Sequence, residues 1–88
     1  MARCRVIVQG RVQGVYFRGA TRERARAEGA AGWVRNRPDG TVEAVFEGDE
    51  AQLEAMRSFC RHGPRGARVD RVDEHPEPME GLTGFEIR

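Results

Sequence analysis

The chain has 88 residues, 39% of them hydrophobic, and a formal net charge of +1 at pH 7. This length provides for one modest core, so we expect residues 1–88 to form a single domain. The near-neutral charge argues against a general binder of polyanions, which needs a clear basic excess. No apolar run approaches the roughly 18 residues that span a bilayer, and the N-terminus lacks the apolar block of a signal peptide, so we expect a cytoplasmic protein.

The first part of the chain changes from a strand pattern to a helix pattern. Residues 2–9 alternate with the period of a half-buried strand, and one face consists of Ala2, Cys4, Val6 and Val8. A loop bracketed by Gly10 and Gly14 follows. The segment 18–28 is rich in Ala, Arg and Glu and favours a helix, which Gly29 ends. Its apolar stripe is thin and consists of Ala20, Ala25 and Ala27.

A β-hairpin is predicted next. Residues 32–36 and 41–47 have strand patterns and flank the turn signal Pro38-Asp39-Gly40. Proline presets one backbone angle in such a turn, and glycine accepts a positive one.

A second helix follows the hairpin. Asp49 and Gln52 have the spacing of a capping box, and Gly63-Pro64 ends the helix. Its apolar stripe consists of Leu53, Met56, Phe59 and Cys60.

The last part of the chain predicts two further strands. Val69 and Val72 mark a less regular strand, because a spacing of three breaks the alternation. We expect a loop over residues 75–82 and a short terminal strand that includes Phe85 and Ile87. The order β-α-β-β-α-β plus a terminal strand predicts an α+β sandwich, with a mainly antiparallel sheet and two helices on one face.

The two cysteines do not indicate a metal or redox site. Cys4 and Cys60 are far apart in sequence and form no CxxC pair. Both fall on apolar faces, so we expect reduced core residues, with a Cys4–Cys60 disulfide as the alternative. No cluster of Asp, Glu or His has metal-ligand spacing, so no metal and no other cofactor is expected.

The segment between the first strand and the first helix is a candidate anion site. A strand-to-helix loop with glycine can turn backbone N–H groups inward, and the helix N-terminus adds unsatisfied N–H groups and partial positive charge. Arg18 stands at this helix start, where a cation opposes the helix dipole. A bound phosphate would explain this position, because a guanidinium pairs with phosphate in a bidentate way. The residues alone leave two interpretations open, an oxyanion site or a plain turn beside a solvated arginine.

Two motifs resemble the signatures of the acylphosphatase family. The run GRVQGVYFR over residues 10–18 is similar to the phosphate-loop signature. The run GWVRN over residues 32–36, followed by Gly40, Val42 and Gly48, is similar to the second signature. The resemblance covers essentially the whole chain and implies a ferredoxin-like sandwich. It also implies hydrolysis of the carboxyl–phosphate bond of small acyl phosphates to a carboxylate and inorganic phosphate.

The resemblance assigns roles to particular residues. The catalytic arginine falls on Arg18, and the catalytic asparagine falls on Asn36. The phosphate-binding loop falls on Gln13, Gly14, Val15, Tyr16, Phe17 and Arg18. An amide has no useful basicity, so we expect Asn36 to orient the attacking water instead of acting as a general base. Without the resemblance, Asn36 also fits an ordinary residue before the turn.

Two other functions fit the same architecture. An RNA-recognition module would stack bases on aromatic side chains, but strand 41–47 offers only Phe46. An acylphosphatase-like domain could instead act on carbamoyl phosphate within a larger maturation protein. His62 and His75 are expected to be structural or exposed. We expect a small acyl phosphate as substrate, no nucleic-acid or membrane partner, and a monomer.

Overall fold

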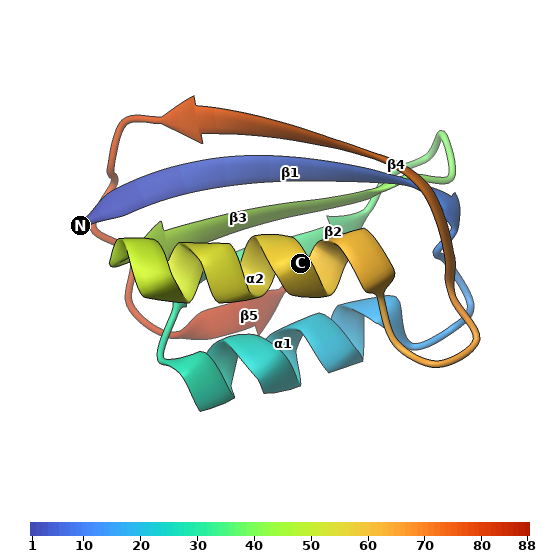
Figure 1. The fold of residues 1–88 in the computed structure, drawn as a ribbon, viewed down its shortest axis with the longest axis horizontal. Coiled ribbons are helices and arrows are strands. Elements are labelled where there is room, and N and C mark those ends of the chain that lie inside the picture. Colours follow the sequence, from blue (N-terminus) through green and yellow to red (C-terminus); the bar gives the residue numbers. More distant parts are fainter.

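A computed structural model describes residues 1–88 as two layers, a five-stranded sheet and two helices packed on one of its faces (Figure 1). The strands are β1 (Ala2–Arg11), β2 (Ala31–Asn36), β3 (Val42–Gly48), β4 (Arg68–Glu77) and β5 (Phe85–Ile87). The helices are α1 (Phe17–Glu28) and α2 (Glu50–His62). The strand order is β4-β1-β3-β2-β5, and all neighbours are antiparallel except β2 and β5. The predicted element order and ferredoxin-like sandwich are confirmed.

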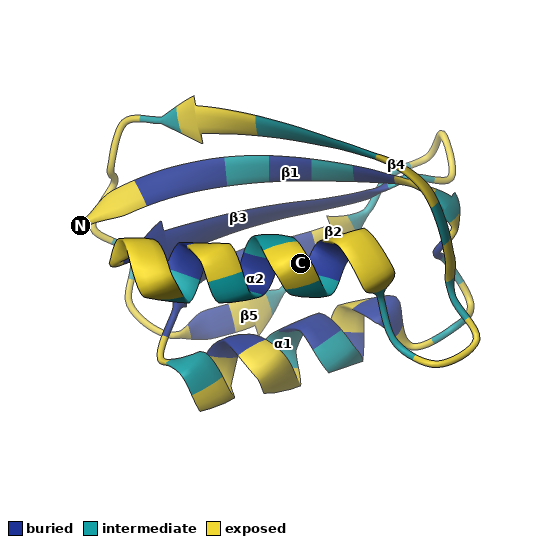
Figure 2. Cartoon of the chain, viewed as in Figure 1, coloured by how far each residue is buried: buried dark blue, intermediate teal, exposed yellow.

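The core lies between the sheet and the helices (Figure 2). In α2, Leu53, Met56 and Cys60 are buried on one face, as their helical spacing predicts. The predicted capping box of Asp49 and Gln52 is present at the start of this helix. Neither α1 nor α2 has the length and apolar character needed to cross a membrane.

The central strand β3 is buried on both faces. All residues from Val42 to Gly48 are buried, although apolar and charged side chains alternate along them. Phe46 points into the core, where its ring stacks on that of Phe85 with centroids 5.6 Å apart. Phe46 therefore offers no exposed platform for stacking a nucleotide base.

Helix α1 begins at Phe17, one residue before the predicted start, and buries a different stripe. Phe17, Thr21 and Ala25 follow one another at intervals of four and are all buried. The Thr21 hydroxyl donates to the Phe17 carbonyl at 2.7 Å, so this polar group is satisfied inside the core. The predicted stripe is wrong for Ala27, which is exposed, and Ala20 is only half-buried.

Strand β4 extends further than the sequence pattern indicates. The predicted loop over 75–82 is wrong for residues 75–77, which continue β4 and pair with β1. Proline lacks a backbone N–H, and an edge strand such as β4 tolerates Pro76 because no strand pairs with its outer side.

A β-bulge explains the irregular spacing of the valines in β4. Val72 lies opposite Val8 and Val69 lies opposite Gly10, so Asp70 is an extra residue in the ladder. The bulge changes which side chains face inward. Val69 and Val72 therefore both pack against the core, despite a spacing of three.

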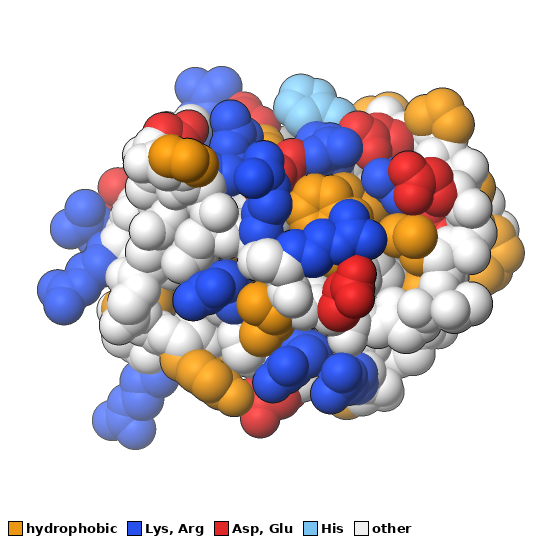
Figure 3. Space-filling model, turned by 180° about the vertical axis from the view of Figure 1, so that it is seen from behind, with side chains coloured by type: hydrophobic (Ala, Val, Ile, Leu, Met, Phe, Trp, Pro, Cys, Tyr) orange, Lys and Arg blue, Asp and Glu red, His pale blue; other side chains and the backbone are white.

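The helix-free face of the sheet carries charged side chains of both signs around apolar ones (Figure 3). The guanidinium of the buried Arg3 contacts Glu47 at 2.9 Å and Glu77 at 3.0 Å. The Glu47 carboxylate also accepts hydrogen bonds from the backbone N–H groups of residues 80–82. These contacts anchor the connection between β4 and β5 to the central strand.

Candidate active site

The loop between β1 and α1 turns sharply at two positions. Gly14 has a φ of 75° and Tyr16 has a φ of 62°, both in the left-handed region. Tyr16 is the N-cap of α1 and is the one residue other than glycine with a positive φ in the chain. For a side chain of this size the left-handed conformation costs roughly 1–2 kcal/mol. The turn therefore directs the chain into α1 at an energetic cost, as is common at functional sites.

The first turn of α1 has free backbone donors. No side chain caps the helix, and its first turn contains no acidic residue. The N–H of Ala20 bonds to the Tyr16 carbonyl at 3.0 Å, which leaves the preceding N–H groups of the turn without an intrahelical acceptor. These donors and the helix dipole create a local preference for an anion.

A cavity of about 370 Å³ lies against this turn. Its lining includes Arg18 and Arg22 from α1, Asn36 from the end of β2, and Ile87 from β5. Gly14, Tyr16 and Phe17 of the loop also line it. The fold thus brings Arg18 and Asn36, which belong to different motifs of the sequence, to one site.

The Asn36 side chain has an unsatisfied polar atom in this cavity. Its Oδ1 is buried and has no hydrogen-bond partner in the protein. Leaving a buried acceptor unsatisfied costs about 1–3 kcal/mol. A water or ligand donor in the cavity would remove this cost.

Gln13 connects the loop to the β2–β3 hairpin. Its Nε2 donates to the carbonyls of Arg37, at 2.8 Å, and Thr41, at 3.0 Å. The side chain of Gln13 thereby ties the loop before Arg18 to the turn that follows Asn36. Not all of the predicted phosphate-loop residues line the cavity. Gln13 and Val15 do not, and Val15 packs against the core instead.

Arg22 lines the cavity but is not among the residues that the sequence motifs indicate. It lies four positions after Arg18, a spacing that places the two side chains on the same helix face. Neither guanidinium forms an ion pair, whereas Arg24 of the same helix pairs with Glu28 at 3.0 Å. The helical spacing from Arg18 is the signal in the sequence that could have identified Arg22.

The remaining candidate groups lie elsewhere. Cys4 and Cys60 are both free and buried, as predicted, and burial raises the pKa of each thiol. His62 and His75 are exposed and do not line the cavity. No group of three or more His, Cys, Asp or Glu side chains is arranged to hold a metal ion.

Comparison with known families decides the assignment. The model of the family described as acylphosphatase matches residues 4–87, which is nearly the whole chain. The chain belongs to the acylphosphatase family. Membership makes it a hydrolase of acid anhydrides that acts on small acyl phosphates.

Individual acylphosphatases are similar over their full length. The acylphosphatase of Haloarcula marismortui is 56% identical, over 98% of this chain and 94% of the relative. The crystal structure of the acylphosphatase from Bacillus subtilis superposes with a TM-score of 0.96 at 37% identity, over 100% of this chain and 99% of that one. The same fold occurs within a longer chain, T. kodakarensis HypF, with a TM-score of 0.86 at 32% identity. That match spans 100% of this chain and 12% of HypF.

Proposed function

We propose that the chain hydrolyses acyl phosphates by attack of water on a phosphoryl group held by the β1–α1 loop and Arg18, with Asn36 positioning the water. The observation that supports this most directly is the shared cavity. Arg18 brings an unpaired positive charge to it, and Asn36 brings a buried acceptor without a partner. Residues 1–88 act in this proposal as one catalytic domain and as a monomer.

The phosphoryl group needs positioning and charge stabilisation more than covalent chemistry. The free N–H groups at the start of α1 and the Arg18 guanidinium supply hydrogen-bond donors on one side of the cavity. Such fixed donors stabilise the charge that develops on the phosphoryl oxygens in the transition state. Gly14 keeps this part of the loop free of a side chain that would crowd the phosphate.

Asn36 acts on the nucleophile. Its Oδ1 accepts a hydrogen bond from water and orients the water oxygen toward phosphorus. As the new P–O bond forms, the bond between phosphorus and the acyl oxygen breaks, and the carboxylate leaves with the electron pair. The water proton passes to an oxygen of the phosphoryl group, so no protein base is required.

The test is release of inorganic phosphate from acetyl phosphate, measured with and without excess EDTA. We expect turnover to survive the chelator, because the positive field comes from the backbone and Arg18. Activity that vanishes with EDTA and returns with Mg²⁺ would contradict this mechanism. Carbamoyl phosphate serves as the second substrate, and cleavage of carbamoyl phosphate alone would favour the activity expected of a maturation-protein domain.

A further inference from the structure

We propose that Arg22 is a specificity-determining residue that binds a second negatively charged group, such as a carboxylate, on the acyl part of the substrate. The proposal rests on the proposed function, because it assumes that the phosphoryl group lies at Arg18. It concerns the part of the cavity that Arg22 lines. Three features of Arg22 support it: its position, its lack of a partner, and the apolar residues beside it.

The position of Arg22 places a second charge at a defined separation from the first. Arg22 lies four residues, just over one helical turn, after Arg18, about 6 Å further along the axis. Both residues line the same cavity. A substrate whose phosphoryl group binds at Arg18 would therefore extend its acyl chain along α1 toward Arg22.

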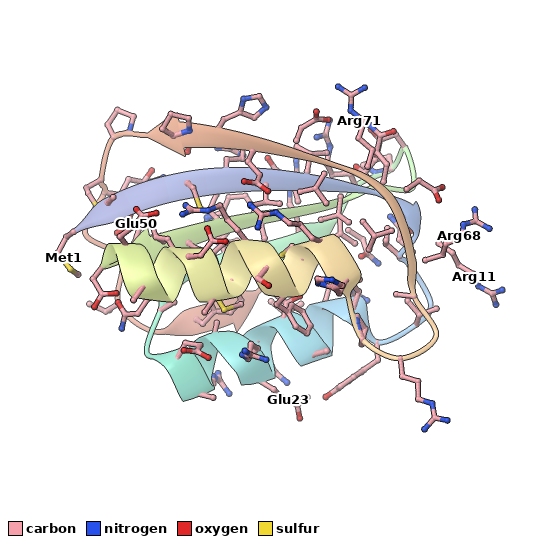
Figure 4. The ribbon with its side chains drawn as sticks, in the orientation of Figure 1. Met1, Arg11, Glu23, Glu50, Arg68 and Arg71 are labelled. Carbon is pink, nitrogen blue, oxygen red and sulfur yellow. The ribbon has the colours of Figure 1, made fainter.

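Arg22 lacks the partners that its neighbours have. Arg24 pairs with Glu28, and Arg26 donates to the Phe85 carbonyl at 3.1 Å. Glu23, the acidic residue next to Arg22, points away from the body of the protein (Figure 4) and forms no ion pair. Arg22 is half-buried nonetheless, so part of its hydration is lost without compensation within the protein.

The pair of arginines is unfavourable unless an anion is bound. Like charges at a spacing of four on a helix repel each other and destabilise it. Most of the other arginines pair with carboxylates, and Arg11, which does not, points outward into solvent (Figure 4). Arg18 and Arg22 differ from these arginines, since both line a cavity and neither has a partner.

The wall of the cavity fits a short carbon chain between the two anionic groups. Ile87 of β5 and Tyr16 of the loop line the same cavity as the two arginines and provide apolar surface. This arrangement suits an acyl phosphate of a dicarboxylic acid. The phosphoryl group would bind at the loop, the methylene groups would contact the apolar wall, and the distal carboxylate would pair with Arg22.

The test compares succinyl phosphate with butyryl phosphate, which have four-carbon acyl groups and differ in the terminal carboxylate. We expect the wild type to prefer succinyl phosphate in kcat/KM by about tenfold, the size of one partly exposed charge-assisted contact. In Arg22→Gln the preference should disappear through a higher KM for succinyl phosphate, while kcat/KM for butyryl phosphate stays within about twofold. Arg22→Lys should retain part of the preference. Arg24→Gln removes the same charge from the opposite side of α1 and should behave like the wild type.

Two results would overturn the proposal. Equal losses on both substrates in Arg22→Gln would show that Arg22 acts on the phosphoryl group, and an unchanged preference in this variant would show that it does not contact the acyl group. A wild type that hydrolyses butyryl phosphate without preferring succinyl phosphate also contradicts the inference, but leaves the proposed function intact. A wild type that hydrolyses neither compound would contradict the proposed function itself.

Discussion

The Tyr16 ring lies directly against Gly19, where an added Cβ atom would come within 2.2 Å of Tyr16 Cε1. Both residues line the cavity at the start of α1. Tyr16 is the left-handed N-cap, and Gly19 lies within the first turn. The absence of a side chain at Gly19 therefore determines where the ring bounds the cavity.

Gly19→Ala separates the stability of α1 from the shape of the site. Alanine favours a helix over glycine by about 1 kcal/mol, so the melting temperature should stay level or rise. The new methyl group should displace the Tyr16 ring and lower kcat/KM for acetyl phosphate by about tenfold, as small misplacements at reactive sites do. Tyr16→Ala is the control, because the double variant should lose no more activity than either single one. Full activity in Gly19→Ala would show that the ring position is unimportant.

Arg18→Lys tests whether a point charge suffices at the phosphate site. Lysine keeps the positive charge but loses the planar, two-pronged donor set. We expect losses in kcat/KM of order 10²-fold or more for both Arg18→Lys and Arg18→Ala, as for removal of other oxyanion donors. Arg18 has no ion pair to lose, so thermal melts should match the wild type. If Arg18→Lys keeps most of the activity, bidentate binding is not needed.

Asn36→Ala separates chemistry from phosphate binding. Competitive inhibition by inorganic phosphate reports the phosphate site, and its inhibition constant should stay within a few-fold of wild type while kcat falls steeply. The Asn36 Oδ1 is buried without a partner, so its removal should not lower the melting temperature. A collapse of phosphate affinity with a normal melt would instead identify Asn36 as a phosphate ligand. A collapsed melt would identify it as a structural residue.

Gln13→Ala tests whether the link between the loop and the hairpin positions the two catalytic groups. The variant loses the hydrogen bonds to the carbonyls of Arg37 and Thr41, which contribute about 1–2 kcal/mol together. For a chain of this size we expect the melting temperature to fall by roughly 4–16 °C. We also expect kcat to fall more than phosphate affinity, since Asn36 and the loop lose their relative placement. Gln9→Ala, at an exposed position in β1, is the control, and an equal effect there would contradict the linking role.

Glu47→Gln tests a pH-dependent part of the stability. Burial opposes ionisation of Glu47, but hydrogen bonds from the backbone of residues 80–82 and from Arg3 hold the pKa of its carboxyl below the usual value. A carboxyl whose pKa is lowered by folding stabilises the fold at pH values above its pKa in the unfolded state, which is about 4.3. This contribution disappears as the pH falls through the pKa of the folded state. In chemical denaturation, the free energy of unfolding of Glu47→Gln should be well below that of the wild type at neutral pH. The difference between the two should become smaller below about pH 4.

The exposed Glu86 provides the matched control for this pH series. It pairs with Arg88 at the surface, where an ion pair contributes little. Glu86→Gln should therefore follow the wild type at every pH. A Glu47→Gln stability deficit of constant size from neutral to acidic pH would show that the loss is one of packing and not of charge.

The elements that the sequence predicts well are those with local signals. The hairpin follows from Pro38-Asp39-Gly40, and α2 follows from its capping box and the spacing of Leu53, Met56 and Cys60. Each of these signals involves residues within a few positions of one another, so the chain needs no distant partner to express them. The motifs around Arg18 and Asn36 are also continuous runs of residues, and they indicate the family by themselves.

The tertiary structure decides what depends on distant contacts. Residues 75–77 form a strand because β1 offers them an open edge, and the inward stripe of α1 runs through Thr21 because that face meets the sheet. The sequence by itself determined the family and the candidate catalytic side chains. Only the packing of β2 beside the β1–α1 loop placed Asn36 with Arg18, and only the cavity that forms there distinguished Arg22 from the other arginines of α1. The physical reason is that a cavity is formed by elements far apart in the chain, whose approach is determined by burial of the whole core.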